Sequence, residues 1–149
     1  MNEIDIYALE RFDEQHGIAK DDLKFSGYQI LLLGKPLSQW HEEMWTWLAE
    51  NPQNSKQDFL NIHFESHTEI LRGLKNASSC FACLYDNILS ISLGEEIKCS
   101  HCPIRESLDA LGWEKCDGIY FTWGQCKIYG EFSRASEFAK TISELEWEW

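Results

Sequence analysis

Basic residues are scarce in this 149-residue chain, which has 13 Lys and Arg against 25 Asp and Glu and a net charge of −12. The deficit argues against a general affinity for DNA or RNA, because that affinity comes from Lys and Arg set against phosphates. The acidic residues are spread along the chain. They fit either a charge that keeps the protein in solution or a protein whose partner is basic. Such a partner could be a nucleic-acid-binding protein whose groove this chain blocks.

Long apolar runs are also missing. Runs such as ILLL at residues 30–33 are far too short to span a membrane. Residues 1–15 are charged and lack the apolar stretch of a secretory signal, so we expect a cytoplasmic protein. Thiols stay reduced in the cytosol, where paired cysteines hold a metal more often than they form disulfides.

Several catalytic signatures are absent from the sequence. It contains no G-x-x-x-x-G-K-[ST] loop, no G-x-G-x-x-G turn and no G-x-S-x-G nucleophile elbow. Adjacent acidic pairs such as Asp21 and Asp22 point to opposite sides of any regular element, so they indicate solvated surface. We therefore expect no catalytic residues and a protein that is not an enzyme.

The fold class that we predict is mainly α, of the α+β kind. Hydrophobic residues make up 44% of the chain, and we find no repeat, low-complexity stretch or linker, which favours one domain over residues 1–149. Residues 18–34 fit a helix or a strand equally well. Residues 118–132 have a strand-like composition. We expect this helical domain to carry a small β or irregular piece around its cysteines.

Five helices are predicted from apolar periodicity and end signals. One spans residues 6–15, and one starts at a Ser38 cap, ends before Pro52 and buries Trp40, Met44, Trp47 and Leu48. A third, within residues 54–76, opens with a Ser55/Asp58 capping box. A short helix over residues 103–112 starts at Pro103 and ends at Gly112. A closing helix is capped by Ser133 and buries Phe138, Ala139, Ile142 and Leu145.

Two histidines fall on the third of these helices. His63 and His67 are four residues apart, so both project from one helix face. They lie near the middle of the apolar stripe, which favours hydrogen-bonded core histidines. H-x3-H is also a metal-ligand spacing, and the alternative is a mixed site with Cys80 and Cys83. The stripe consists of Leu60, Phe64, Ile70, Leu71 and Leu74.

The strongest pattern is C-x2-C-x15-C-x2-C, formed by Cys80, Cys83, Cys99 and Cys102. Each C-x2-C can place two sulfurs on one tight turn, and two such turns complete the tetrahedron of thiolates that zinc favours. Four protein thiolates leave no open position, so the zinc is expected to be structural.

We expect residues 78–104 to form this zinc-binding module within the domain. The alternating segment at residues 87–98 would be a hairpin between the two turns. Cys116 and Cys126 are left over; they could replace a ligand or pair under oxidation, and buried thiols are the default.

The order of motifs resembles small phage and prophage proteins of Gram-positive bacteria. The resemblance rests on a W-x-W-L helix at residues 45–48, CFAC at 80–83, CSHCPI at 99–104, and YFTW with FAKTISEL further on. It spans roughly residues 40 to 145, matches the four paired cysteines, and makes Cys116 the family's further cysteine. It implies an accessory protein in the host cytosol, of the kind that includes anti-CRISPR and other anti-defence proteins.

Three functions remain open at this stage. The first is a non-enzymatic, zinc-stabilised binding protein that inhibits a host defence effector, such as a CRISPR-Cas nuclease, by protein–protein contact. The second is a zinc-ribbon-like factor associated with nucleic acid. The third is a metal-dependent hydrolase built on His63, His67 and one or more cysteines. The second would use the basic residues near the cysteines, namely Lys98, Arg105, Lys115 and Lys127.

The zinc hypothesis predicts one zinc per chain, with the paired thiols protected until a chelator unfolds the protein. Binding of the metal would then supply folding free energy, because the unfolded chain has no preformed site. Native mass spectrometry with metal analysis and thiol counting measures this directly. A metal-free protein with fewer than six titratable thiols would instead indicate disulfides.

Overall fold

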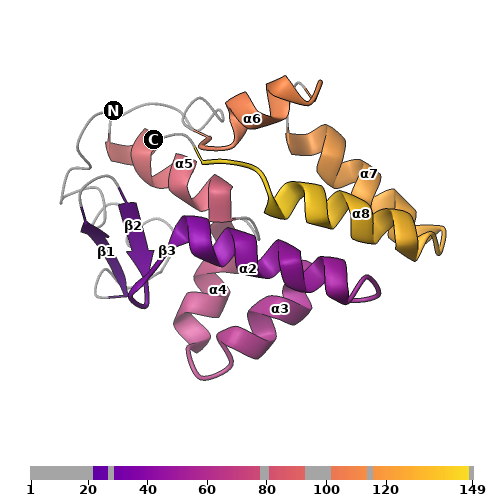
Figure 1. Ribbon diagram of the computed structural model, residues 1–149. Helices are drawn as coiled ribbons and strands as arrows, with labels where there is room; N and C mark the ends of the chain where they lie inside the picture. Colours follow the sequence, from indigo (N-terminus) through magenta and orange to yellow (C-terminus); the bar gives the residue numbers. More distant parts are fainter. Residues whose placement is uncertain (1–21, 27–28, 78–80, 93–101, 114–115, 148–149) are drawn as a thin grey trace.

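Seven helices and a three-stranded sheet make up the part of the chain that the structure describes (Figure 1). The structure is a computed structural model, and it describes residues 22–26, 29–77, 81–92, 102–113 and 116–147. None of the described helices is long and apolar enough to cross a membrane. The helix expected at residues 6–15 lies outside these residues. The predicted class, mainly α with a little β, is confirmed.

The sheet is antiparallel in the order β1-β2-β3 and precedes the helices. Its strands are Leu23–Ser26, Gln29–Leu32 and Lys35–Pro36. The described part of the ambiguous segment at residues 18–34 thus contains strands, with Leu23 paired to Leu32 and both side chains buried. A two-residue turn joins β2 to β3, with φ of 51° at Leu33 and 79° at Gly34. Tight hairpin turns need positive φ at both positions, which costs Leu33 roughly 1–2 kcal/mol and Gly34 little.

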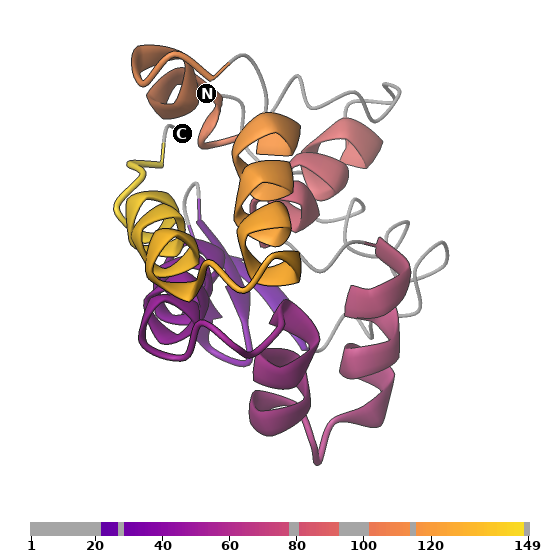
Figure 2. The ribbon, with the colours of Figure 1, turned by 90° about the vertical axis from the view of Figure 1, so that its right-hand side faces the viewer.

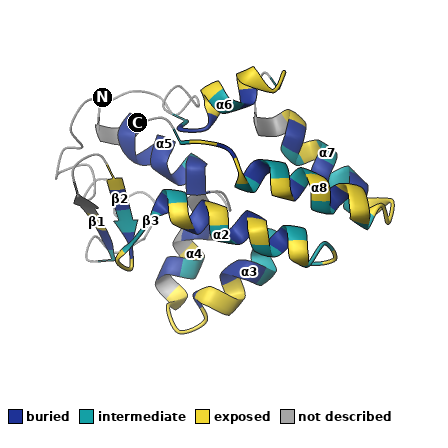
Figure 3. Cartoon of the chain, viewed as in Figure 1, coloured by how far each residue is buried: buried dark blue, intermediate teal, exposed yellow. Residues whose placement is uncertain are grey.

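Helix α2, Leu37–Glu50, is the centre of the fold. It packs most extensively against α8 (Phe132–Ser143) and also contacts α3 (Lys56–His63), α5 (Phe81–Ser92) and the sheet (Figures 1 and 2). Helix α7, Cys116–Ile128, packs against α8 and also contacts α2. The remaining helices are α4, Thr68–Ala77, and α6, Arg105–Ala110. The core therefore forms where these elements meet the inner face of α2 (Figure 3).

The three tryptophans of α2 each meet a different neighbour. Trp40 packs against Phe64 and Phe81, at ring-centroid distances of 4.9 and 5.9 Å. Its indole nitrogen also donates a 2.9 Å hydrogen bond to the Leu32 carbonyl of β2. Trp45 lies 4.9 Å from the ring of Trp123 in α7. Trp47 meets α3 at Phe59, 5.9 Å away. These rings supply much of the buried apolar surface.

Several predicted elements are confirmed. Ser55 accepts from the Asp58 amide and the Asp58 carboxylate accepts from the Ser55 amide, which is the predicted capping box at α3. Gly112 follows α6 with a φ of 88°. The helix at α2 and the closing helix α8 also form. Their expected inward residues are buried, apart from Trp47 and Phe138, which are half-buried.

The two predicted serine caps are wrong. Helix α2 begins after Pro36 and α8 begins after Glu131, and neither has a side-chain cap. Ser38 and Ser133 both lie inside their helices. Proline is a good substitute at the start of α2, because its fixed φ suits a helix entrance and it has no amide hydrogen to satisfy.

The strand-like segment at residues 118–132 was also predicted wrongly, because it forms most of α7. Ile119, Trp123 and Cys126 are buried at helical spacing, which is the inner face. The outer face carries Phe121 and Ile128, whose exposed fractions are 67% and 74%, and Tyr129 follows at 74%. With apolar residues on both faces, the sequence shows no amphipathic period, and the β-prone aromatic composition dominates.

The predicted hairpin at residues 87–98 is wrong as far as Ser92, because Phe81–Ser92 is helix α5; the rest lies outside the described residues. From Phe81 to Ser90 every side chain is buried except that of Cys83, which is half-buried. Its polar residues Asp86, Asn87 and Ser90 are buried together with the apolar ones, so polarity does not mark a solvent-facing side of this helix. In the described chain the small sheet is formed by residues 23–36, and no strand is formed by the segments that carry the paired cysteines.

The single helix predicted within residues 54–76 is two helices, α3 and α4. The chain turns at residues 64–67, where the His67 amide donates to the Phe64 carbonyl at 3.0 Å. Ser66, His67 and Thr68 are weak helix formers, so propensity does not hold the helix across them. The predicted apolar residues still face the core: Leu60, Phe64, Ile70 and Leu74 are buried and Leu71 is half-buried.

Two serine variants test the helix starts. Ser55→Ala removes the cap of α3 and should lower the free energy of unfolding by about 1 kcal/mol. Ser133→Ala is the matched control and should change it by less than about 0.5 kcal/mol, because Ser133 is exposed and caps nothing. Urea unfolding of both variants measures the difference, and equal losses would contradict these helix boundaries.

Candidate functional site

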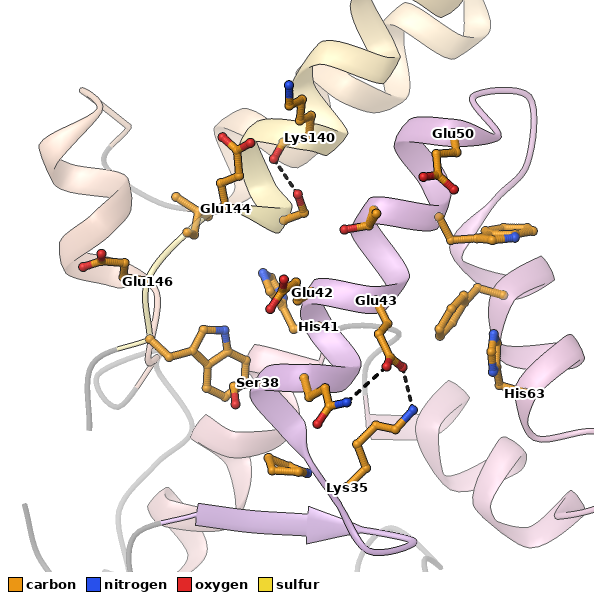
Figure 4. A pocket seen from close by; sticks show the side chains of 18 residues that line it. Lys35, Ser38, His41, Glu42, Glu43, Glu50, His63, Lys140, Glu144 and Glu146 are labelled. Atoms are coloured by element: carbon orange, nitrogen blue, oxygen red, sulfur yellow. Dashed lines mark hydrogen bonds and ion pairs between the residues drawn. The ribbon is translucent and has the colours of Figure 1, made fainter.

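A hollow of about 1540 Å³ runs along the outer side of α2, and we call it the α2 groove (Figure 4). Its walls are β3, α3, and the end of α8 with the segment that follows it. Five carboxylates line it against two ammonium groups, so its lining is acidic. The carboxylates are Glu42, Glu43, Glu50, Glu144 and Glu146, and the ammonium groups are Lys35 and Lys140.

The polar floor of the groove follows from the pattern of α2. While Trp40, Met44 and Leu48 face the core, the opposite side of the helix carries polar residues at helical spacing. Glu42 and Glu50 on this side are exposed, and Glu43 is half-buried. The same helix therefore supplies the centre of the core and the floor of the groove.

Lys35 and Glu43 form an ion pair within the groove. The Lys35 ammonium lies 2.6 Å from Oε2 of Glu43, and Gln39 donates to Oε1 at 3.2 Å (Figure 4). The ammonium also lies 4.0 Å from the centroid of the Trp40 ring. Burial alone would raise the pKa of Glu43, but the hydrogen bonds from Lys35 and Gln39 and the charges of Lys35 and His63 lower it.

An aromatic wall stands on the α3 side of the groove. It consists of Trp47, Phe59 and His63, with the rings of Phe59 and His63 4.1 Å apart. His63 also meets Trp40 edge to face at 5.9 Å. Partial burial lowers the pKa of His63, the Lys35 charge lowers it further, and Glu43 opposes this. The imidazole is thereby favoured in its neutral form beside the ion pair.

His41 lies on the other side of α2, toward α8. Its Nε2 is 3.0 Å from the Ile142 carbonyl oxygen, which can only accept, so Nε2 carries the hydrogen. The side chain is 1% exposed, and burial lowers its pKa to about 4, against the weaker opposing effect of that hydrogen bond. Its Nδ1 is buried and accepts from no group in the described residues. Trp147 packs edge to face against the ring.

The structure describes two of the four predicted zinc ligands. Cys80 and Cys99 lie outside the described residues. Cys83 stands in the first turn of α5 and Cys102 precedes α6; both are half-buried and pack against the core. Within the described ranges, no three His, Cys, Asp or Glu side chains are grouped to hold a metal.

The two leftover cysteines differ in what the structure shows of them. Cys126 is a buried thiol on α7, as expected by default. Cys116 begins that helix, and its side chain is not described.

The histidine prediction needs correction. His63 ends α3 and His67 precedes α4, so they do not share a helix face. Both are exposed, and neither lies in the core as the stripe had suggested. Only His63 reaches the α2 groove. The arrangement that motivated the hydrolase alternative is therefore absent.

The nucleic-acid alternative requires a basic patch, and the described residues offer little of one. Lys98 and Lys115 lie outside the described residues, and Arg105 is exposed on α6. Lys127 donates to the Asn54 carbonyl and lies 4.4 Å from the centroid of the Trp123 ring. Burial lowers its pKa and the Lys56 charge adds to this, while Asp58 opposes both. Lys127 thus joins α7 to the loop before α3 and does not face outward freely.

The residues on which the groove depends do not follow from the sequence alone. Glu42, Glu43 and Glu50 fall between the apolar positions of α2, and this spacing indicates that one side of the helix is polar. No sequence signal places Lys35 of β3 against that side, because the contact depends on how the hairpin meets the helix. A comparison of the chain with protein-family models, curated proteins and solved structures finds no match.

Acid should destabilise the protein through His41. Its pKa falls from 6.5 to about 4 on folding, so the unfolded chain takes the proton more readily and stability is lost as the pH falls from 6.5 toward 4. The shift corresponds to roughly 3 kcal/mol at most. His41→Gln can keep a donor for Ile142 and should flatten this part of the stability profile.

Urea unfolding over this pH range measures the effect. His67→Gln is the matched control, because His67 is exposed, and its profile should follow that of the natural chain. An unchanged slope in His41→Gln would contradict the assignment to His41.

Proposed function

We propose that the protein is a non-enzymatic binding protein whose α2 groove takes a basic segment of a protein partner. The observation that carries the proposal is the lining of the groove, with five carboxylates, two lysines and an aromatic wall on one concave surface. Carboxylates attract Lys and Arg side chains and orient guanidinium groups, while aromatic faces add cation–π contacts. Together these features suit a Lys- or Arg-rich segment.

The charge of the whole chain supports the same function. A net charge of −12 steers a basic partner toward the protein and raises the rate of association at low salt. It also disfavours nucleic acid as the direct ligand, since phosphates would meet a like-charged surface. A second hollow, lined by Lys56 and Lys127, is small at about 390 Å³, and Lys127 already donates to the Asn54 carbonyl.

The partner that we propose is a host defence effector, such as a CRISPR-Cas nuclease, whose basic nucleic-acid groove the acidic face would occupy. This part of the proposal comes from the resemblance to phage proteins of Gram-positive bacteria. Inhibition would be by occupancy, with exposed carboxylates in place of phosphates and aromatic side chains as anchors. No catalytic step is required of the chain.

A structural zinc held by Cys80, Cys83, Cys99 and Cys102 is part of the proposal. Thiolates are suitable zinc ligands. Cys83 and Cys102 belong to segments that pack against one core, and both are half-buried at its edge. When bound, the metal would tie α5 to the segment before α6 and add to folding stability.

The proposed function predicts binding of an arginine-rich peptide that weakens as ionic strength rises from roughly 0.05 to 0.5 M, because the charges on both sides are exposed. The double variant Glu42→Lys and Glu146→Lys should weaken binding by about tenfold. Isothermal titration calorimetry at several salt concentrations measures both effects.

The control is Glu106→Lys, an exposed carboxylate of α6 outside the groove. It changes the net charge by the same amount per site and should weaken binding by about twofold or less. Absence of binding at low salt, or an equal loss per site in the control, would refute the groove as the binding surface.

A further inference from the structure

A cation already occupies the α2 groove, and the chain itself supplies it. The Lys35 ammonium lies 4.0 Å from the centroid of the Trp40 ring and 2.6 Å from Oε2 of Glu43. These are the two contacts by which proteins recognise cationic side chains, an aromatic face and a carboxylate. The geometry around Lys35 is therefore that of a cation site with an occupant, and Figure 4 shows the ion pair of Lys35 with Glu43.

Lys35 uses only part of this site. Its ammonium contacts one oxygen of Glu43, and the other oxygen accepts, among the described residues, a 3.2 Å hydrogen bond from the exposed Gln39. A guanidinium is planar, so it can stack on an indole face and donate to both carboxylate oxygens at once. The neighbouring His63 ring, edge-on to Trp40 at 5.9 Å, extends the aromatic surface beside it.

A second observation points to the same class of ligand. His41 lines the groove, and its Nδ1 is a buried acceptor to which no described residue donates. Because Nε2 carries the hydrogen, Nδ1 has only a lone pair to offer. The surrounding glutamates are acceptors as well. A ligand rich in donors therefore complements the groove, and an anionic ligand does not.

We propose that the Trp40 face and the Glu43 carboxylate bind an arginine side chain of the partner, and that Lys35 fills this site until the arginine displaces it. The inference rests on the proposed function and names the group that the groove recognises. Lys35 acts as a tethered competitor that reduces the apparent affinity. A partner lysine replaces Lys35 by an equivalent ammonium, whereas an arginine gains stacking and a second hydrogen bond, so the site discriminates between them.

Removal of the competitor is the test. Lys35→Ala should bind a peptide of alternating Arg and Gly about three- to tenfold more tightly than the natural chain, which is the size expected for one ion pair with a cation–π contact. The matched peptide of alternating Lys and Gly should gain less. Isothermal titration calorimetry gives both affinities, and thermal unfolding shows that the variant is folded.

Lys140→Ala is the charge-matched control. It removes one positive charge from the same groove, but Lys140 is exposed and on α8, away from the Trp40 ring. Its affinity for the arginine peptide should change by about twofold or less. Lys35→Arg keeps the site filled and should give no increase. Glu43→Gln keeps the shape of the side chain, removes its charge and should abolish the preference for arginine over lysine.

The possible outcomes separate this inference from the proposed function. If the natural chain binds the arginine peptide and Lys35→Ala binds it no more tightly than Lys140→Ala does, the inference is overturned and the proposed function stands. If none of the chains binds either peptide at low salt, the proposed function fails and the inference falls with it. If only Lys35→Ala binds, the site exists and Lys35 closes it, as proposed.

Discussion

The buried hydrogen bond between His41 and the Ile142 carbonyl joins the two helices on which the fold depends. It links residues 101 positions apart, across the most extensive helix pair in the molecule, α2 and α8. The imidazole must stay neutral to remain in this dry position, which is why its pKa is low. Through α2 the same constraint reaches the sheet, α3 and α5, because each of them packs on that helix.

A single helix thus has two tasks. Its inner face holds the core together through tryptophans that reach different neighbours, and its outer face presents the carboxylates of the groove. A binding surface on a helix that is packed from three sides loses little conformational entropy when a ligand arrives. Core packing and recognition are therefore coupled in this molecule, and a substitution such as one at Trp40 would affect both.

The sequence predicted what is encoded locally. The capping box at Ser55 and the glycine after α6 follow from short-range chemistry, and the buried stripes of α2 and α8 follow from a clear helical period. It failed at α5, whose polar residues are buried together with the apolar ones, and at α7, which is apolar on both sides. The contact of Lys35 with Trp40 and Glu43 brings β3 against α2. Neither a hydrophobic period nor a sequence motif predicts such a contact between two elements. The four paired cysteines remain a sequence prediction.

The outer face of α7 has a physical consequence of its own. The side chains of Phe121, Ile128 and Tyr129 are exposed to solvent. Copies of the chain repel one another, because each has an excess of twelve negative charges. That repulsion vanishes near the isoelectric point, about pH 4.7, where attraction between such apolar surfaces is no longer opposed. The acidity of the chain is thus also a colloidal stabiliser, and it lets α7 keep an apolar outer surface at neutral pH.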